Sequence, residues 1–122
     1  MKLDKIGREK IIKYLGIFDL YEELDVNGIK IVLVHGGLLN FDENKDLDEY
    51  DNYDIIWGRY GYTKQYYRDK YLVTGHTPTY HINPNYKGRI FKKNNHITID
   101  CGVIQGGQLG CICLNTFEEF HI

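Results

Sequence analysis

Residues 29–34 are almost wholly apolar, and this segment constrains the fold of the chain more than any other. A short apolar run bounded by turn residues predicts a strand that is buried on both faces. Asn27-Gly28 precedes the run, and this dipeptide strongly favours a hairpin because both turn positions need a positive φ angle. Residues 20–26 are therefore expected to form the partner strand. The apolar run stops abruptly at His35-Gly36-Gly37.

The remaining sequence predicts one helix and several further short strands. Residues 3–15 carry apolar side chains roughly on one helical face and are followed by Gly16, which predicts a helix with a glycine stop. Short strands are expected at residues 71–74, 89–92, 96–100, 109–114 and 116–121. No repeat or linker divides the 122 residues, so we expect a single, mostly stranded α+β domain over residues 1–122.

Residues 42–54 carry seven acidic side chains and one lysine. Asp42, Asn44 and Asp46 begin like a calcium-binding loop. However, Leu47 stands where such a loop needs glycine, and Tyr53 stands where it needs glutamate. We therefore expect a solvated helix or loop here, followed by a short apolar element over residues 53–57.

Composition and charge exclude several classes of function. Fifteen basic and seventeen acidic residues give a net charge of −2, which argues against a nucleic-acid binder. The sequence contains no serine, so no serine nucleophile is possible. The charged first residues do not resemble a signal peptide, and no apolar run approaches the roughly 18 residues of a membrane span. The odd number of cysteines, three, favours a reduced, cytoplasmic setting, and we expect no membrane partner.

Two histidines share a sequence context that favours a site. His35 and His76 each follow a short apolar strand and stand next to glycine. A histidine in this position points beyond the edge of a sheet, where binding and catalytic sites are commonly found. Imidazole is also a ligand for manganese, iron or zinc. Arg59, in Trp57-Gly58-Arg59, lies between them, and its guanidinium can bind phosphate or carboxylate through two parallel bonds. A surface ion pair with the preceding acidic segment is the alternative for Arg59.

The other histidines and the strand cysteines give weaker signals. His81, beyond Pro78, could support a nearby site residue, His96 is expected in a polar hairpin turn, and His121 lies in the tail. Cys111 and Cys113 alternate on one predicted strand and so point to the same face. Because there is no second cysteine pair to complete four ligands, we interpret them as two small buried residues.

Four linked motifs together resemble the calcineurin-like metallophosphoesterases. The resemblance is greatest to the bacterial and phage Ser/Thr protein phosphatase branch, with the symmetrical diadenosine-tetraphosphate hydrolases as its neighbour. The resemblance begins near Leu20 and continues to the end of the chain. The motifs lie in residues 32–38 (Val-Leu-Val-His-Gly-Gly-Leu), 57–59 (Trp-Gly-Arg), 73–79 (Val-Thr-Gly-His-Thr-Pro-Thr) and 99–109, which holds Ile-Asp-Cys-Gly and Gly-Gly-Gln-Leu.

The resemblance implies a two-sheet αββα sandwich and a site with two divalent metals, commonly manganese or iron. An aspartate and a hydroxide bridge the metals in this family. His35 and His76 match two ligands of the same metal, Arg59 matches an arginine that holds the phosphate oxygens, and Asp100 matches a structural segment beside the site. The implied activity is that of a phosphoric ester hydrolase.

The first three motifs of the family, Asp-x-His, Gly-Asp-x-x-Asp and Gly-Asn-His-Asp/Glu, are absent from this sequence. The resemblance therefore covers the C-terminal half of the domain only. Catalysis by two metals needs both ions, so we expect this chain alone to be catalytically incomplete. Half of a sandwich exposes strand edges and apolar surface, so the missing N-terminal half or a homo-oligomer is the expected partner.

Three interpretations of function follow. The first is the C-terminal part of a phosphoesterase that hydrolyses phosphate monoesters, acting on a phosphorylated protein or a small phosphoester such as a dinucleoside polyphosphate. The second is a non-catalytic module that binds phosphate or a partner. The third is a protein that binds one zinc ion through His35, His76 and a nearby acidic residue. Mn²⁺ is the cofactor that the first interpretation favours, with iron or zinc as alternatives.

Overall fold

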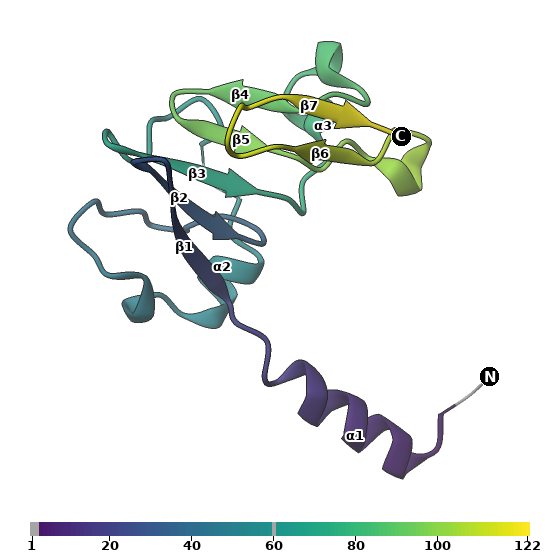
Figure 1. The fold of residues 1–122 in the computed structure, drawn as a ribbon. Coiled ribbons are helices and arrows are strands. Elements are labelled where there is room, and N and C mark those ends of the chain that lie inside the picture. Colours follow the sequence, from purple (N-terminus) through teal and green to yellow (C-terminus); the bar gives the residue numbers. More distant parts are fainter. Residues whose placement is uncertain (1–2, 60) are drawn as a thin grey trace.

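A computed structural model describes residues 3–59 and 61–122. The helices are α1 (Lys5–Leu15), α2 (Asn52–Ile56) and α3 (Thr79–Ile82), with short 3₁₀ helices at Leu47–Glu49, Pro84–Tyr86 and Val103–Gln105. The strands are β1 (Tyr21–Val26), β2 (Ile29–Val34), β3 (Lys70–Thr74), β4 (Phe91–Lys93), β5 (His96–Thr98), β6 (Gly110–Ile112) and β7 (Glu119–His121). The fold is mixed α+β, as the sequence predicted (Figure 1).

Five strands form a mixed sheet in the order β1-β2-β3-β5-β4. Asn27 and Gly28 have φ angles of 55° and 82°, and they turn β1 antiparallel onto β2, which confirms the predicted hairpin. The strands β2, β3 and β5 run parallel to one another, so their carboxyl ends meet at the same edge of the sheet. The strands β6 and β7 form a separate antiparallel pair.

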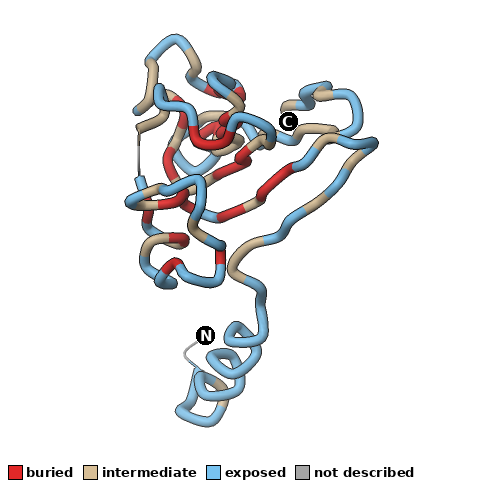
Figure 2. The backbone as a smooth tube through the Cα atoms, turned by 90° about the vertical axis from the view of Figure 1, so that its left-hand side faces the viewer, coloured by how far each residue is buried: buried red, intermediate tan, exposed pale blue. Residues whose placement is uncertain are grey.

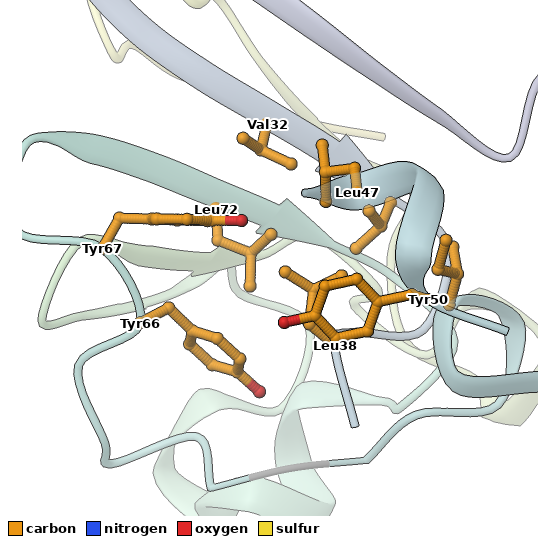
Figure 3. Packing of buried hydrophobic residues seen from close by; sticks show 9 residues of the cluster. Val32, Leu38, Leu47, Tyr50, Tyr66, Tyr67 and Leu72 are labelled. Atoms are coloured by element: carbon orange, nitrogen blue, oxygen red, sulfur yellow. The ribbon is translucent and has the colours of Figure 1, made fainter. Parts of the chain in front are cut away.

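The apolar residues of β2 enter two different cores. Val32 and Val34 belong to a cluster that includes Leu72 and is closed by Tyr66 and other residues of the loops (Figure 3). Ile31 belongs to a second cluster on the opposite face. Because successive residues of a strand point to opposite faces, this arrangement confirms that β2 is buried on both sides. Figure 2 shows the same pattern, with the buried residues concentrated in and around the large sheet.

The other elements cover the two cores. Ile112, Leu114 and Phe117, from β6 and the turn that follows it, pack against the second cluster. The acidic segment is solvated, as expected, but Leu47 and Tyr50 anchor it in the first cluster. The short apolar element expected at residues 53–57 corresponds to α2 and its terminal Trp57.

Helix α1 stands apart from both cores (Figures 1 and 2). The Asp4 carboxylate accepts a hydrogen bond from the Gly7 N–H at 2.7 Å and caps the first turn, and Gly16 ends the helix. The predicted helix is therefore confirmed, but none of its residues is buried. None of the helices in the described part of the chain has the length and apolar character that crossing a bilayer requires.

Two sequence-based interpretations are wrong. His96 does not lie in a polar turn but within β5, where it is 1% exposed. Asn94 and Asn95 have positive φ angles of 53° and 59°, so these two residues close the hairpin and His96 falls inside the strand. Cys111 and Cys113 are not both buried, because Cys111 is exposed and Cys113 is partly exposed beside the edge of the small sheet.

Candidate functional site

Two histidines lie side by side at the carboxyl ends of adjacent parallel strands. His35 directly follows β2, and His76 follows β3 after Gly75. The Gly75 N–H donates to the His35 carbonyl at 2.8 Å, which extends the backbone pairing beyond both strands. The two imidazole ring centroids are 5.1 Å apart. The structure thus brings together the pair of histidines that the sequence singled out.

Gly36 ties the end of β2 to helix α2. Its N–H donates to the Ile55 carbonyl at 2.8 Å. A Cβ at position 36 would lie 2.5 Å from the Ile56 carbonyl oxygen, so only glycine allows this close approach of two backbone segments. The contact fixes where α2 ends relative to His35, and Arg59 follows α2 by three residues.

His76 adopts a backbone conformation that is unusual for a residue with a side chain. Its φ angle is +65°, and the Thr77 N–H donates to the Gly75 carbonyl at 2.7 Å across it. These features describe a three-residue turn centred on His76. A positive φ costs a non-glycine residue about 1–2 kcal/mol, and such strain is found preferentially at functional sites. The turn aims the His76 ring toward His35.

Arg59 and Trp57 contact the His76 ring. A guanidinium nitrogen of Arg59 lies 3.1 Å from His76 Nε2. Guanidinium has no acceptor, so Arg59 donates to the lone pair of Nε2, and His76 is neutral with its proton on Nδ1. The Trp57 ring meets the His76 ring edge-on, with centroids 5.0 Å apart. The structure therefore joins Arg59 to the predicted histidine pair rather than to the acidic segment.

The surroundings of His76 lower its pKa below the usual 6.5. Partial burial is the main cause, and electrostatic interactions with Arg59 and with His35 act in the same direction. The carboxylate of Asp100 opposes them. His76 is therefore held in the neutral form that can donate its lone pair.

This electrostatic arrangement predicts the effect of removing the Arg59 charge. In Arg59→Gln, the pKa of His76 is expected to rise, because a cation that disfavours protonation is lost. Titration of the His76 ring protons by NMR measures the shift. Arg89→Gln, which removes an exposed arginine outside this cluster, serves as the matched control and is expected to leave the His76 pKa unchanged. A His76 pKa that stays constant or falls in Arg59→Gln would contradict the arrangement.

Asp100 lies beside the site without joining it. Its Oδ1 accepts a hydrogen bond from the Gly102 N–H at 2.9 Å, and its carbonyl accepts from the Thr79 N–H at 2.8 Å. Across residues 3–59 and 61–122, no three His, Cys, Asp or Glu side chains converge to hold a metal ion. The His35–His76 pair is therefore not joined by a third such side chain within these residues.

The remaining histidines lie elsewhere in the fold. His81 contacts Tyr80 within α3, with ring centroids 4.2 Å apart. His121 Nε2 lies 3.3 Å from a Glu119 carboxylate oxygen in the small sheet. Neither of these two contacts involves His35, His76 or Arg59, so the supporting role considered for His81 stays a prediction.

The buried His96 contacts Tyr62, a residue that no sequence pattern indicated. The ring of Tyr62 stacks on the His96 ring, with centroids 5.5 Å apart and planes 9° apart. Burial raises the pKa of Tyr62, and the charge of Arg59 opposes that rise. No periodicity marks the loop that contains Tyr62, so only the folded structure reveals this contact.

Comparison with known proteins does not assign the chain to a family. No protein-family model matches the sequence, and no curated protein matches it at a significant level.

Proposed function

We propose that this chain is the C-terminal part of a metal-dependent, calcineurin-like phosphoesterase that hydrolyses phosphate monoesters and is catalytically incomplete alone. The observation that carries the proposal is the gathering of His35, His76 and Arg59 at one edge of the sheet. Neutral imidazoles suit manganese, iron or zinc, and a guanidinium suits phosphate. The separate β6–β7 pair, whose residues pack on one face of the large sheet, supports a two-sheet αββα sandwich as the parent fold.

His35 and His76 would hold one divalent ion, with Mn²⁺ as the first choice. When bound, a pair of metals supplies hydroxide as the nucleophile and polarises the phosphoryl oxygens. The first three motifs of the resembled family would supply the other ligands, so an N-terminal half that carries them would have to complete the site. The three cysteines are all unpaired, which supports a cytoplasmic setting for this bacterial type of enzyme.

Arg59 is proposed to alternate between two acceptors. It now donates to His76 Nε2, and coordination of a metal through that nitrogen requires the guanidinium to leave. The released guanidinium can then donate two parallel hydrogen bonds to the phosphate of a substrate. Metal binding and phosphate binding would in this way be coupled through one side chain.

The experiment that tests the proposal measures metal binding and turnover separately. Mn²⁺ is titrated into the full chain while the histidine ring signals are followed by NMR. We expect paramagnetic broadening at His35 and His76 before His81, and its loss in His35→Ala. If Mn²⁺ broadens all histidines alike, or neither of this pair, the proposed metal site is wrong.

Turnover is tested with para-nitrophenyl phosphate and Mn²⁺, first with the chain alone and then with a phosphatase N-terminal half that carries the three missing motifs. We expect hydrolysis only in the completed assembly and a loss of about 100-fold in Arg59→Ala, as for removal of one preorganised donor. Arg89→Ala is the matched control. A phosphopeptide and a symmetrical dinucleoside tetraphosphate, compared in the same assay, distinguish the two proposed substrate classes. No hydrolysis in the completed assembly would contradict the proposal.

The contact between Arg59 and His76 also favours a second candidate function. It holds the Arg59 guanidinium, a bidentate donor suited to phosphate, at the sheet edge beside His76, as a non-catalytic module that binds a phosphate group would need. This alternative predicts that inorganic phosphate, in the absence of Mn²⁺, shifts the Arg59 Nε–H and His76 signals. It also predicts that the completed assembly stays inactive.

A further inference from the structure

Helix α1 is too short and too exposed to be stable by itself. It has eleven residues and buries none of them, whereas isolated helices shorter than about 12–15 residues are marginal in water. Gly7 weakens it further, by about 1 kcal/mol relative to alanine. The exposed apolar residues of the helix and its flanks are Leu3, Ile6, Ile11, Ile12, Tyr14, Leu15, Ile17 and Phe18. Stable helix in this segment therefore requires a surface that covers these side chains.

A groove lies along β1, the strand at one edge of the large sheet. A cavity of about 520 Å³ is lined by residues 18–23 and by Asp48. A second cavity of about 260 Å³ shares Asp19, Leu20, Tyr21 and Glu22 with it and reaches His35. We call the larger cavity, lined by residues 18–23 and 48, the β1 groove.

The charges of the β1 groove and of α1 are complementary. Four carboxylates line the groove: Asp19, Glu22, Glu23 and Asp48. The described lining contains no lysine or arginine. Helix α1 carries four cations and one carboxylate: Lys5, Arg8, Lys10, Lys13 and Glu9. Leu20 supplies apolar surface between the groove carboxylates. A basic amphipathic helix is therefore the ligand that the groove suits.

We infer that α1 of one copy of this chain docks into the β1 groove of a second copy, and the reverse, in a two-fold dimer. Residues 16–20 connect α1 to β1 at the groove itself, and α1 leads away from its own sheet (Figure 1). Reciprocal exchange covers both helices and both grooves at once, as in domain swapping. The inference does not rest on the proposed function.

Exchange of the charges tests this dimer. The first variant, Lys10→Glu with Lys13→Glu, makes the helix acidic. The second, Asp19→Lys with Glu22→Lys, cancels the net negative charge of the groove. The second pair leaves the Glu23–Lys70 ion pair and the Tyr21–Asp48 hydrogen bond in place. Sedimentation equilibrium of the full chain at 5–200 µM, in about 0.1 M salt, measures the dimer dissociation constant. We expect the wild type to be dimeric and each variant to dissociate at least tenfold more readily.

A mixture of the two variants provides the decisive control. In the mixture, the acidic helix faces a groove without net charge and the basic helix faces the acidic groove, so the repulsive pairing is avoided and a one-to-one heterodimer is expected. If the mixture forms the heterodimer, the loss of each homodimer was not caused by damage to the helix or the strand. Lys87→Glu with Lys93→Glu, outside the β1 groove, is expected to leave the dimer intact. A monomeric wild type, or a dimer that both charge variants leave unchanged, would overturn the inference, as would a mixture that stays monomeric.

Discussion

Gly58→Ala is expected to lower the free energy of unfolding by about 3 kcal/mol or more, at the upper end of the range for overpacking. A Cβ at position 58 would lie 2.1 Å from the Asp54 carbonyl oxygen and 3.1 Å from the Leu39 backbone nitrogen. Both are backbone atoms, so no side-chain rotation relieves the overlap. Arg59 follows directly, so the same backbone shift is expected to separate its guanidinium from His76.

Urea unfolding and the His76 titration together check this prediction. The matched control is Gly16→Ala, because a Cβ there meets nothing closer than 3.4 Å. Its φ of −69° is also open to any residue. Gly16→Ala is expected to leave stability within about 0.5 kcal/mol of the wild type. If Gly58→Ala were as stable as the wild type, or left the His76 pKa unchanged, then the approach of residue 58 to α2 would not hold Arg59 in place.

Acid is expected to destabilise the fold through His96 well before it protonates most carboxylates. Burial lowers the pKa of His96 from 6.5 to about 4. Its Nε2 lies 2.9 Å from the Thr74 hydroxyl and 3.4 Å from that of Thr98. Among the described residues, Nδ1 has no hydrogen-bond partner. The rings of Tyr62 and Tyr66 cover the imidazole, and no charged group contributes to the shift. A proton added to this ring would have no compensating partner.

The direction of the effect follows from linkage. The folded state binds the His96 proton less readily than the unfolded state, so the stabilising contribution is complete above pH 6.5 and is lost as the pH falls toward 4. The difference in pKa corresponds to about 3 kcal/mol over this window. His76, whose pKa is also lowered, acts in the same direction.

Urea unfolding between pH 7.5 and 4.5 measures this dependence. His96→Gln keeps a polar side chain but removes the titration, so its stability is expected to vary less over the same window, whatever its value at pH 7. His81→Gln, at an exposed position, is the matched control and is expected to follow the wild type. Parallel pH profiles for the wild type and His96→Gln would show that His96 is not the group responsible.

Local turn chemistry explains why much of the fold could be predicted from the sequence. Asn27-Gly28 specifies the β1–β2 hairpin because few residues adopt two successive positive φ angles. The same physics explains the error at His96. Asn94 and Asn95 both tolerate the left-handed region, so the turn closes one residue earlier than a turn containing His96 would.

The candidate site could be predicted only in part. Strand ends followed by glycine identified His35 and His76, because backbone order alone brings the ends of neighbouring parallel strands together. The contact of Arg59 with His76 Nε2 depends on how α2 packs against residues 36 and 37, which is a tertiary property. The exposure of α1 could not be predicted either, because an amphipathic pattern does not identify the surface that covers the apolar face of the helix.

The hydrogen bond between Gly75 and His35 has a consequence for how this protein can change during evolution. The separation of the two imidazoles is set by backbone atoms of β2 and β3, which pair in register, and not by the side chains beneath them. Substitutions that repack the cores, such as leucine for isoleucine, change stability but leave this backbone ladder in place. Substitutions that accumulate in the cores are therefore expected to lower the melting temperature of the protein before they change the distance between the two histidines.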